Sequence, residues 1–242
     1  MQWRGVFATK FVAVNAGVCR DSGPVEVSEL RVFRGPRRKC LFTLSCRSQS
    51  AAPAAGVEYG RTLIYMSIRE EIKYWCEDAH RRLFHVAPTM PDAEAKRELF
   101  GSEEINRLIW GPWTNEQEEY RCGLLWAATD RFVIGRPITM ALSTPYKKPK
   151  WTYLARLDPL EDEVWEIRVF DPKPGIRIFG QFGDLNLFIA LTWARREALP
   201  DSREWRDARE GCKAEWRKLF PTYDAITGDS VNEYVSHNAI SV

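Results

Sequence analysis

The sequence predicts an α+β fold in which helices pack on a small, mostly antiparallel sheet of four strands. Four segments between residues 151 and 192 have the apolar, β-branched and aromatic content of strands, and tight turns separate them. Helix-forming segments with apolar residues at helical spacing precede and follow these strands. Strands joined by short turns pair as an antiparallel meander, so the helices are left to cover its faces.

The N-terminal residues 1–65 differ in character from the rest of the chain. Residues 1–50 hold nine Lys or Arg against three Asp or Glu, net +6, whereas the remaining 26 basic and 30 acidic residues give −4. Two β-prone stretches, 26–33 and 40–45, show no joint periodicity, and a small-residue stretch follows them. We interpret residues 1–65 as a basic, poorly ordered leader upstream of an alternative start at Met66. A basic nucleic-acid-binding arm is the competing interpretation.

Residues 66–112 are predicted to form a helical extension. Ser67 and Glu70 have the spacing of a capping box, and Asp92 and Ser102 are helix-capping residues ahead of two further segments. The expected helices span Ile68–Phe84, Ala93–Phe100 and Glu103–Trp110.

Residues 113–222 carry the predicted sheet and two longer helices. Thr114 caps a helix over Asn115–Ile134, and Asp201 or Ser202 caps a final helix that ends at Phe220. A short segment at Ile138–Leu142 precedes the sheet, and residues 223–242 are expected to form a loosely ordered tail. The four expected strands are Trp151–Leu157, Val164–Phe170, Ile176–Phe182 and Leu187–Thr192.

Three strand sequences and a basic pair carry a family resemblance. The runs Trp165–Arg168, Gly175–Phe179 and Phe188–Thr192, followed by Arg195 and Arg196, resemble the RelE/HigB toxin superfamily over roughly residues 113–220. The resemblance implies a RelE-like fold with extra N-terminal helices. It also implies a metal-free, cofactor-free endoribonuclease of a toxin–antitoxin system, acting on RNA or ribosome-bound mRNA, with an antitoxin protein as partner. Separately, the six scattered cysteines form no disulfide framework, which favours a reducing cytoplasm over secretion.

Cleavage of RNA by its own 2′-hydroxyl needs a base, a cation for the phosphorane and an acid for the leaving oxygen. The resemblance assigns the phosphate to the strand arginines and the basic pair, and Glu166 is a candidate base beside them. The predicted catalytic residues are Arg168, Arg177, Arg195, Arg196 and Glu166. The general acid stays unassigned: arginine is a poor proton donor, the matching region has no histidine, and Tyr146, Tyr153 and Tyr223 are unranked.

A basic loop before the first strand is a candidate RNA-binding segment. Its residues are Lys147, Lys148, Lys150 and Trp151, whose indole can stack on a base. For each feature a structural interpretation stays open. The tryptophan can pack at a strand end, and the strand arginines can pair with Glu166, Asp171 or Glu163.

The alternative function is a non-catalytic module of the same fold that binds RNA or a protein. The missing histidine and a net charge of only +2 over residues 145–220, from fifteen basic and thirteen acidic residues, favour it. A third hypothesis has residues 68–110 cover the groove as a built-in inhibitor or an oligomerisation surface. No apolar run is long enough to span a membrane, and the six cysteines lack metal-site spacing, so neither a membrane partner nor a metal is expected.

Overall fold

The computed structural model describes residues 27–34, 40–46, 63–64, 67–90, 92–143, 149, 151–171 and 173–242, and the chain divides into two compact units. The first unit holds strands β1 (Val27–Arg34), β2 (Cys40–Cys46) and β3 (Leu63–Ile64) in one sheet of that order. Strands β1 and β2 coincide with the two β-prone stretches of the sequence. All other elements belong to the second unit.

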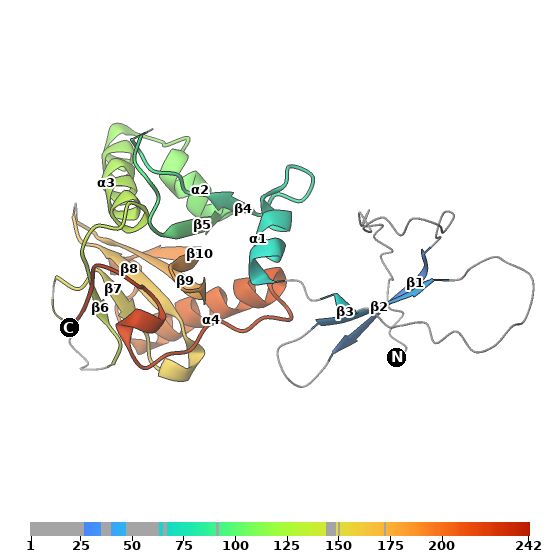
Figure 1. Cartoon of the computed structure of the whole chain (residues 1–242). Helices are drawn as coiled ribbons and strands as arrows, with labels where there is room; N and C mark the ends of the chain where they lie inside the picture. The colour runs from blue at the N-terminus through green and yellow to red at the C-terminus, as the bar shows by residue number, and fades with distance from the viewer. Residues whose placement is uncertain are drawn as a thin grey trace, which may run out of the picture. The chain divides into compact units, whose positions relative to one another are not determined.

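The second unit is built on an eight-stranded mixed sheet with the order β11-β6-β7-β8-β9-β10-β5-β4 (Figure 1). Its strands are β4 (Leu83–His85), β5 (Glu98–Ser102), β6 (Ile138–Ala141), β7 (Leu154–Arg156), β8 (Trp165–Val169), β9 (Ile176–Asp184), β10 (Leu187–Arg195) and β11 (Ala239–Ser241). Its helices are α1 (Ile68–Cys76), α2 (Glu103–Trp110), α3 (Glu116–Val133) and α4 (Ser202–Leu219), with short 3₁₀ turns η1 (Leu160–Asp162), η2 (Arg196–Ala198) and η3 (Val231–Glu233).

The prediction of a small four-stranded antiparallel sheet is wrong. The expected meander exists as β7 to β10, but β5 joins β10 in parallel and β6 joins β7 in parallel, and β4 and β11 extend the two edges. Strand β10 is apolar and buried from Leu187 to Leu191. Its backbone donors and acceptors therefore need a partner on both sides, because buried N–H and C=O groups are costly to leave unpaired.

Two of the expected helices contain the missing strands. The helix expected over 68–84 ends at Cys76, and β4 follows it; the segment expected as a helix over 93–100 leads into β5. Arg97, in a sequence that favours helix, is 3% exposed and donates to the carbonyls of Phe132, Arg136, His237 and Asn238. These distant acceptors stabilise an extended backbone that local propensity does not predict.

The capping signals hold at most helix starts. Ser67 and Glu70 form the expected capping box of α1, and the Ser102 hydroxyl accepts the Ile105 N–H at the start of α2. Asn115, rather than Thr114, caps α3. Asp201 caps α4, which has the predicted extent within one residue.

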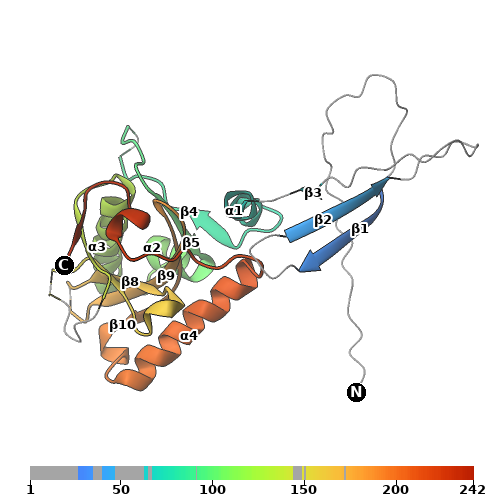
Figure 2. The ribbon, with the colours of Figure 1, turned by 60° about the horizontal axis from the view of Figure 1, so that its bottom comes forward.

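The sheet has an apolar core on each face. Phe132 of α3 packs with Trp165 and Phe188 in one core. Phe179 of β9 and Trp216 of α4 belong to the other core. Figures 1 and 2 accordingly show α2 and α3 on one side of β10 and α4 on the opposite side.

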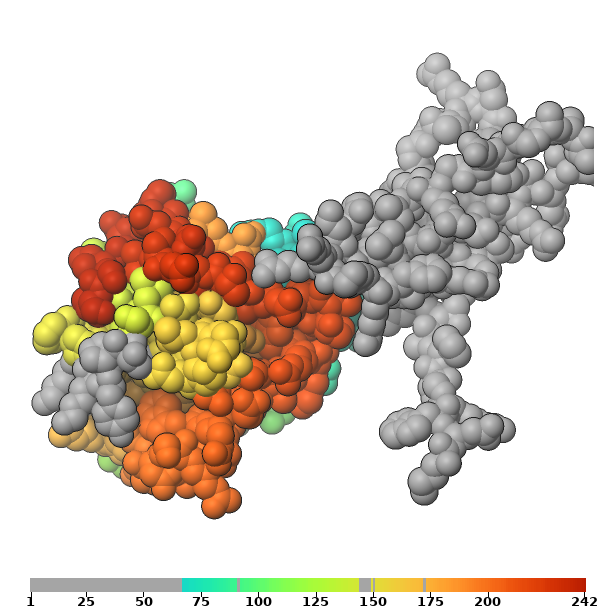
Figure 3. Space-filling model, turned by 90° about the horizontal axis from the view of Figure 1, so that it is seen from below, coloured from blue at the N-terminus to red at the C-terminus, as the bar shows by residue number. Residues whose placement is uncertain are grey.

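The C-terminal segment, expected as a loose tail, packs against the body of the second unit. Tyr234 is fully buried, and β11 pairs in parallel with β6. Figure 3 shows this segment, in red, lying against the yellow surface around η1.

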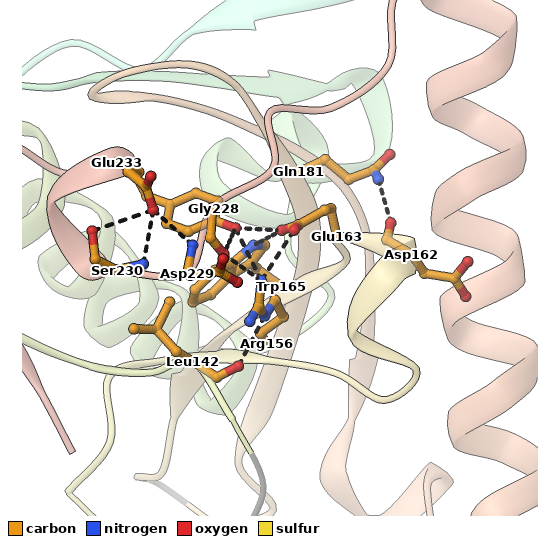
Figure 4. Close-up of polar contacts among 11 residues, drawn as sticks. Leu142, Arg156, Asp162, Glu163, Trp165, Gln181, Gly228, Asp229, Ser230 and Glu233 are labelled. Atoms are coloured by element: carbon orange, nitrogen blue, oxygen red, sulfur yellow. Dashed lines mark hydrogen bonds and ion pairs between the residues drawn. The ribbon is translucent and has the colours of Figure 1, made fainter.

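A buried polar network joins that segment to the sheet (Figure 4). Arg156 Nη1 lies 3.0 Å from Glu163 Oε1 and donates to the Gly228 carbonyl at 2.9 Å. The Tyr234 hydroxyl donates to Glu163 Oε2 at 2.8 Å and accepts from Arg156. Because the two charges are paired and hydrogen-bonded, the interior tolerates them.

Candidate nucleic-acid interface

The sheet register gathers most of the predicted site residues at one end of the sheet. Arg168 on β8 stands opposite Arg177 on β9, and Arg195 on β10 stands opposite Ile176. The Arg168 N–H donates to the Tyr153 carbonyl just before β7. The starts of β7 and β9 and the ends of β8 and β10 therefore lie together.

Glu166, Arg168 and Arg177 form a largely buried cluster on one face of this end. Glu166 Oε2 lies 3.1 Å from Arg177 Nε, and its Oε1 lies 3.5 Å from Arg168 Nε. Both guanidinium groups lie over the Phe170 ring, with centroid distances of 4.8 and 5.0 Å. The pairing with Glu166 that the sequence left open is therefore present, and the carboxylate predicted as a base is engaged by two cations.

Burial is the main influence on Arg177. Its side chain is 5% exposed, and its Nη1 donates to the Val169 and Ile176 carbonyls. Burial lowers the pKa of Arg177, Glu166 opposes this effect, and the nearby cations Arg168 and Arg196 add to it. The cluster thus places more positive than negative charge at one point.

The basic pair divides between the two faces of the sheet. Arg196 stacks on Trp205 at 5.5 Å and lines the same hollow as Arg177. Arg195 instead pairs with Glu118 of α3, with Nη2 3.3 Å from Oε1, and its Nη1 lies 3.9 Å from Glu197 Oε1. Neighbouring residues at the end of a strand point to opposite faces. The structure therefore brings Arg168, Arg177 and Arg196 together and leaves Arg195 apart.

A hollow of about 610 Å³ opens beside the cluster. Its lining consists of Phe170, Lys173, Pro174, Gly175, Arg177, Arg196 and Glu197. Three cations and one carboxylate give the hollow a surplus of positive charge, which favours an anion. Lys173 and Glu197 were not predicted from the sequence, because nothing distinguishes them from ordinary turn charges except their proximity in sequence to the arginines.

Trp151 lies three residues before β7, and 69% of the residue is exposed. Two positions before it, the Pro149 carbonyl accepts a hydrogen bond of 3.1 Å from Arg168 Nη1, so this segment adjoins the arginine cluster. The other predicted RNA-binding residues, Lys147, Lys148 and Lys150, lie outside the described residues, as does Tyr146.

The described tyrosines and histidines do not line the hollow. Tyr153 is buried and donates to the Ala128 carbonyl, and burial raises its pKa above the ordinary value. His237 Nδ1 contacts the Ser236 carbonyl in the C-terminal segment. Lys173 and Glu197 are accordingly the titratable groups that share the hollow with Arg177 and Arg196.

Within the described part of the chain, no group of three or more His, Cys, Asp or Glu side chains could hold a metal ion. Among the same residues, no helix has the length and apolar character needed to cross a membrane.

Comparison of the chain with protein-family models, curated proteins and solved structures gave no match. The resemblance to the RelE/HigB superfamily therefore rests on the quoted strand residues alone.

Proposed function

We propose that the protein binds single-stranded RNA at this end of the sheet. The observation that carries the proposal is the hollow in which Arg177, Arg196 and Lys173 face a single carboxylate, Glu197. Guanidinium groups suit phosphate because their donors are planar and permanently charged. A backbone phosphate in this hollow would neutralise the surplus charge.

The exposed Trp151 ring supports a single-stranded ligand rather than an isolated phosphate. An exposed indole offers a face to an unpaired base, and such stacking contributes roughly 1–3 kcal/mol per base. The lysines at 147, 148 and 150 flank this tryptophan in sequence and extend the cationic segment. Cellular RNA as the ligand places the protein in the cytoplasm, and this location is part of the proposal.

A second candidate function is metal-free cleavage of the bound RNA, favoured by the presence of Glu197 and Lys173 in one hollow. Glu197 would take the 2′-hydroxyl proton, and the 2′-oxygen would attack phosphorus to give a 2′,3′-cyclic phosphate. Lys173 would protonate the departing 5′-oxygen, and the arginines would stabilise the phosphorane. For this candidate, the family resemblance adds ribosome-bound mRNA as substrate and an antitoxin as partner.

The test is fluorescence anisotropy of the full chain with a labelled single-stranded RNA of about 12 nucleotides, titrated at several KCl concentrations. We expect saturable, salt-dependent binding. Arg196→Gln should weaken it and reduce the slope of log K against log [salt] by about 0.7, because one phosphate contact is lost.

The matched control is Arg217→Gln. Arg217 carries the same charge as Arg196 and is likewise exposed. It lies in the last turn of α4, whereas Arg196 lies in η2, ahead of the first turn of this helix. This control should bind like the wild type. Equal weakening by both substitutions, or no saturable binding by the wild type, would contradict the proposal.

A gel assay of the same labelled RNA separates binding from cleavage. Under the second candidate, a cyclic-phosphate product forms, and Glu197→Gln abolishes the product while the RNA still binds. Binding without product assigns a non-catalytic module.

A further inference from the structure

A second hollow, of about 640 Å³, lies beside β10 on the side toward β5. Strand β5 pairs only with Leu187 to Ala190 and then gives way to α2, so the part of β10 from Leu191 to Arg195 has no partner strand on that side within the described chain. The Ser102 hydroxyl, at the junction of β5 and α2, donates to the Leu191 carbonyl at 2.7 Å. The hollow therefore begins where β5 stops, along an open strand edge.

The end of this hollow nearest α3 is cationic. Arg121 and Arg195 both line it, and they share one carboxylate, Glu118, whose pKa is lowered mainly by hydrogen bonds from Thr114 and further by these two cations. Arg121 Nη2 donates to the Lys173 carbonyl, while its buried Nε has no hydrogen-bond partner in the described part of the chain. Arg195 also lies near Glu197, with Nη1 3.9 Å from Oε1, whereas Arg121 has no ion pair with any described residue. The charge of Arg121 is therefore available for an anion.

The end of the hollow nearest α2 and α4 is acidic. Glu104 of α2 and Glu215 of α4 line it together. Arg107 and Arg82 line the hollow as well, but Arg107 pairs with Glu103 and Arg82 lies over the Trp75 ring. Burial, and then repulsion by Glu215, raise the pKa of Glu104. Glu215 has an ion pair with Lys218 of its own helix, but Glu104 has none with any described residue. A cation placed between the two carboxylates would relieve their repulsion.

Apolar side chains line the space between the two charged ends. Leu108 of α2 and Leu191 and Trp193 of β10 contribute to this wall. An apolar wall between opposite charges suits a ligand with an ammonium group at one end, a carboxylate at the other and an apolar body.

We infer that this hollow binds a short peptide of about three residues with both termini free, which extends the line of β5 along the open edge of β10. Its ammonium group meets Glu104 and Glu215, and its carboxylate meets Arg121 and Arg195. The peptide runs parallel to β10, because the acidic end adjoins Leu191 and the cationic end contains Arg195. Three extended residues span roughly 10 Å, a length compatible with a hollow of about 640 Å³.

This site is separate from the proposed RNA interface. Arg195, which the sequence analysis placed with the RNA phosphate, belongs to this hollow through its contact with Glu118 and does not line the hollow that contains Arg177. Failure of either proposal leaves the other intact.

The experiment is calorimetric titration of the full chain with the tripeptides Ala-Leu-Ala and Ala-Phe-Ala, each in free, N-acetylated and C-amidated form. We expect the free peptides to bind, and each terminal modification to weaken binding at least about tenfold, since each removes a charge-assisted contact. If neither free peptide showed saturable binding at about 5 mM, the inference would be overturned, because this concentration exceeds the dissociation constants of even weak specific ligands.

Two substitutions test separately which end of the hollow binds which terminus of the peptide. Arg121→Gln should abolish the discrimination against the C-amide and leave that against the N-acetyl form, and Glu104→Gln should do the reverse. The matched controls are Arg206→Gln on the exposed face of α4 and Glu161→Gln in η1, both exposed. Intact discrimination in both test variants, or equal effects in the controls, would contradict the assignment.

Discussion

The charges at the end of the sheet differ in what they can contribute to binding. Arg177 is buried and paired with Glu166, so replacing it would chiefly leave a buried carboxylate with one fewer cation. Arg196 is exposed, stacks on Trp205 and donates to the Leu199 carbonyl, so its remaining donors face solvent. An RNA phosphate would therefore draw most of its binding free energy from Arg196, with Arg177 as a fixed charge behind it.

The carboxyl of Glu71 in α1 contributes a pH dependence to the stability of the fold. Burial raises the pKa of Glu71 from about 4.5 to about 7. The folded chain thus binds a proton that the unfolded chain releases, and the free energy of unfolding falls as pH rises from about 4.5 to about 7. Glu71→Gln should be more stable than the wild type at pH 8, by about 1 kcal/mol once partial exposure is allowed for. This difference should shrink toward pH 5.

Urea unfolding of the wild type and Glu71→Gln at pH 5 and pH 8 measures this effect. Glu161→Gln, at an exposed position, serves as the control and should show the same pH dependence as the wild type. The free energy of unfolding of the wild type, taken relative to Glu71→Gln, should fall between pH 5 and pH 8. If it rose instead, burial would not destabilise the ionised carboxylate of Glu71.

At the scale of elements, the pairing of β9 with β10 places strict limits on side-chain volume. A Cβ atom at Gly180 would lie 2.2 Å from the Ile189 carbonyl oxygen and 2.6 Å from the Phe188 ring. Since a backbone oxygen in a paired strand cannot move aside cheaply, Gly180→Ala should lower the free energy of unfolding by about 1–3 kcal/mol or more. Urea unfolding of the variant gives this value directly.

Gly211 in α4 provides the opposite case for the same substitution. A Cβ atom there meets nothing within 4 Å. Gly211→Ala should therefore raise the free energy of unfolding by about 0.5–1 kcal/mol, because alanine has the higher helix propensity and glycine gives the unfolded chain more freedom. If both substitutions changed stability in the same direction, the packing of β9 on β10 would differ from that described.

At the scale of the whole molecule, local signals predicted the elements whose stability is local. The meander β7 to β10 and the helices α2, α3 and α4 follow from apolar spacing and capping residues. Strands β4, β5, β6 and β11 are three to five residues long, too short to show alternation, and distant partners determine their pairing. Arg97 illustrates the difficulty, because its acceptors at Phe132 and His237 lie far away in sequence.

The residues of the candidate site likewise divide into those that the sequence places together and those that only the fold brings together. Arg168 and Arg177 could be placed together because both lie on predicted neighbouring strands. Arg195 lies instead beside Glu118 of α3, and alternation along β10 separates it from Arg196. Lys173 and Glu197 carry no motif, so only the folded chain shows that they share a hollow.

The C-terminal segment gives the clearest test of long-range stabilisation. A chain ending at Thr227 loses Tyr234, which is fully buried with its ring centroid 4.8 Å from that of Trp165, and loses two of the carbonyl acceptors of Arg97. Lost burial and unpaired buried donors sum to about 5–10 kcal/mol, comparable with the whole stability of a typical domain. We expect this chain not to unfold cooperatively in urea when monitored by tryptophan fluorescence.

A chain ending at Asn238 is the matched truncation. It keeps Tyr234 and all the acceptors of Arg97 and loses only β11 and Val242, where Ile240 is 58% exposed. Such a short, exposed edge strand contributes little apolar burial, so this chain should unfold cooperatively within about 2 kcal/mol of the full chain. If the chain ending at Thr227 also unfolded cooperatively with the same midpoint, the network of Arg156, Glu163 and Tyr234 would be peripheral to the fold. If it alone failed, residues 228–238 would be part of the core despite a polar sequence that predicts a tail.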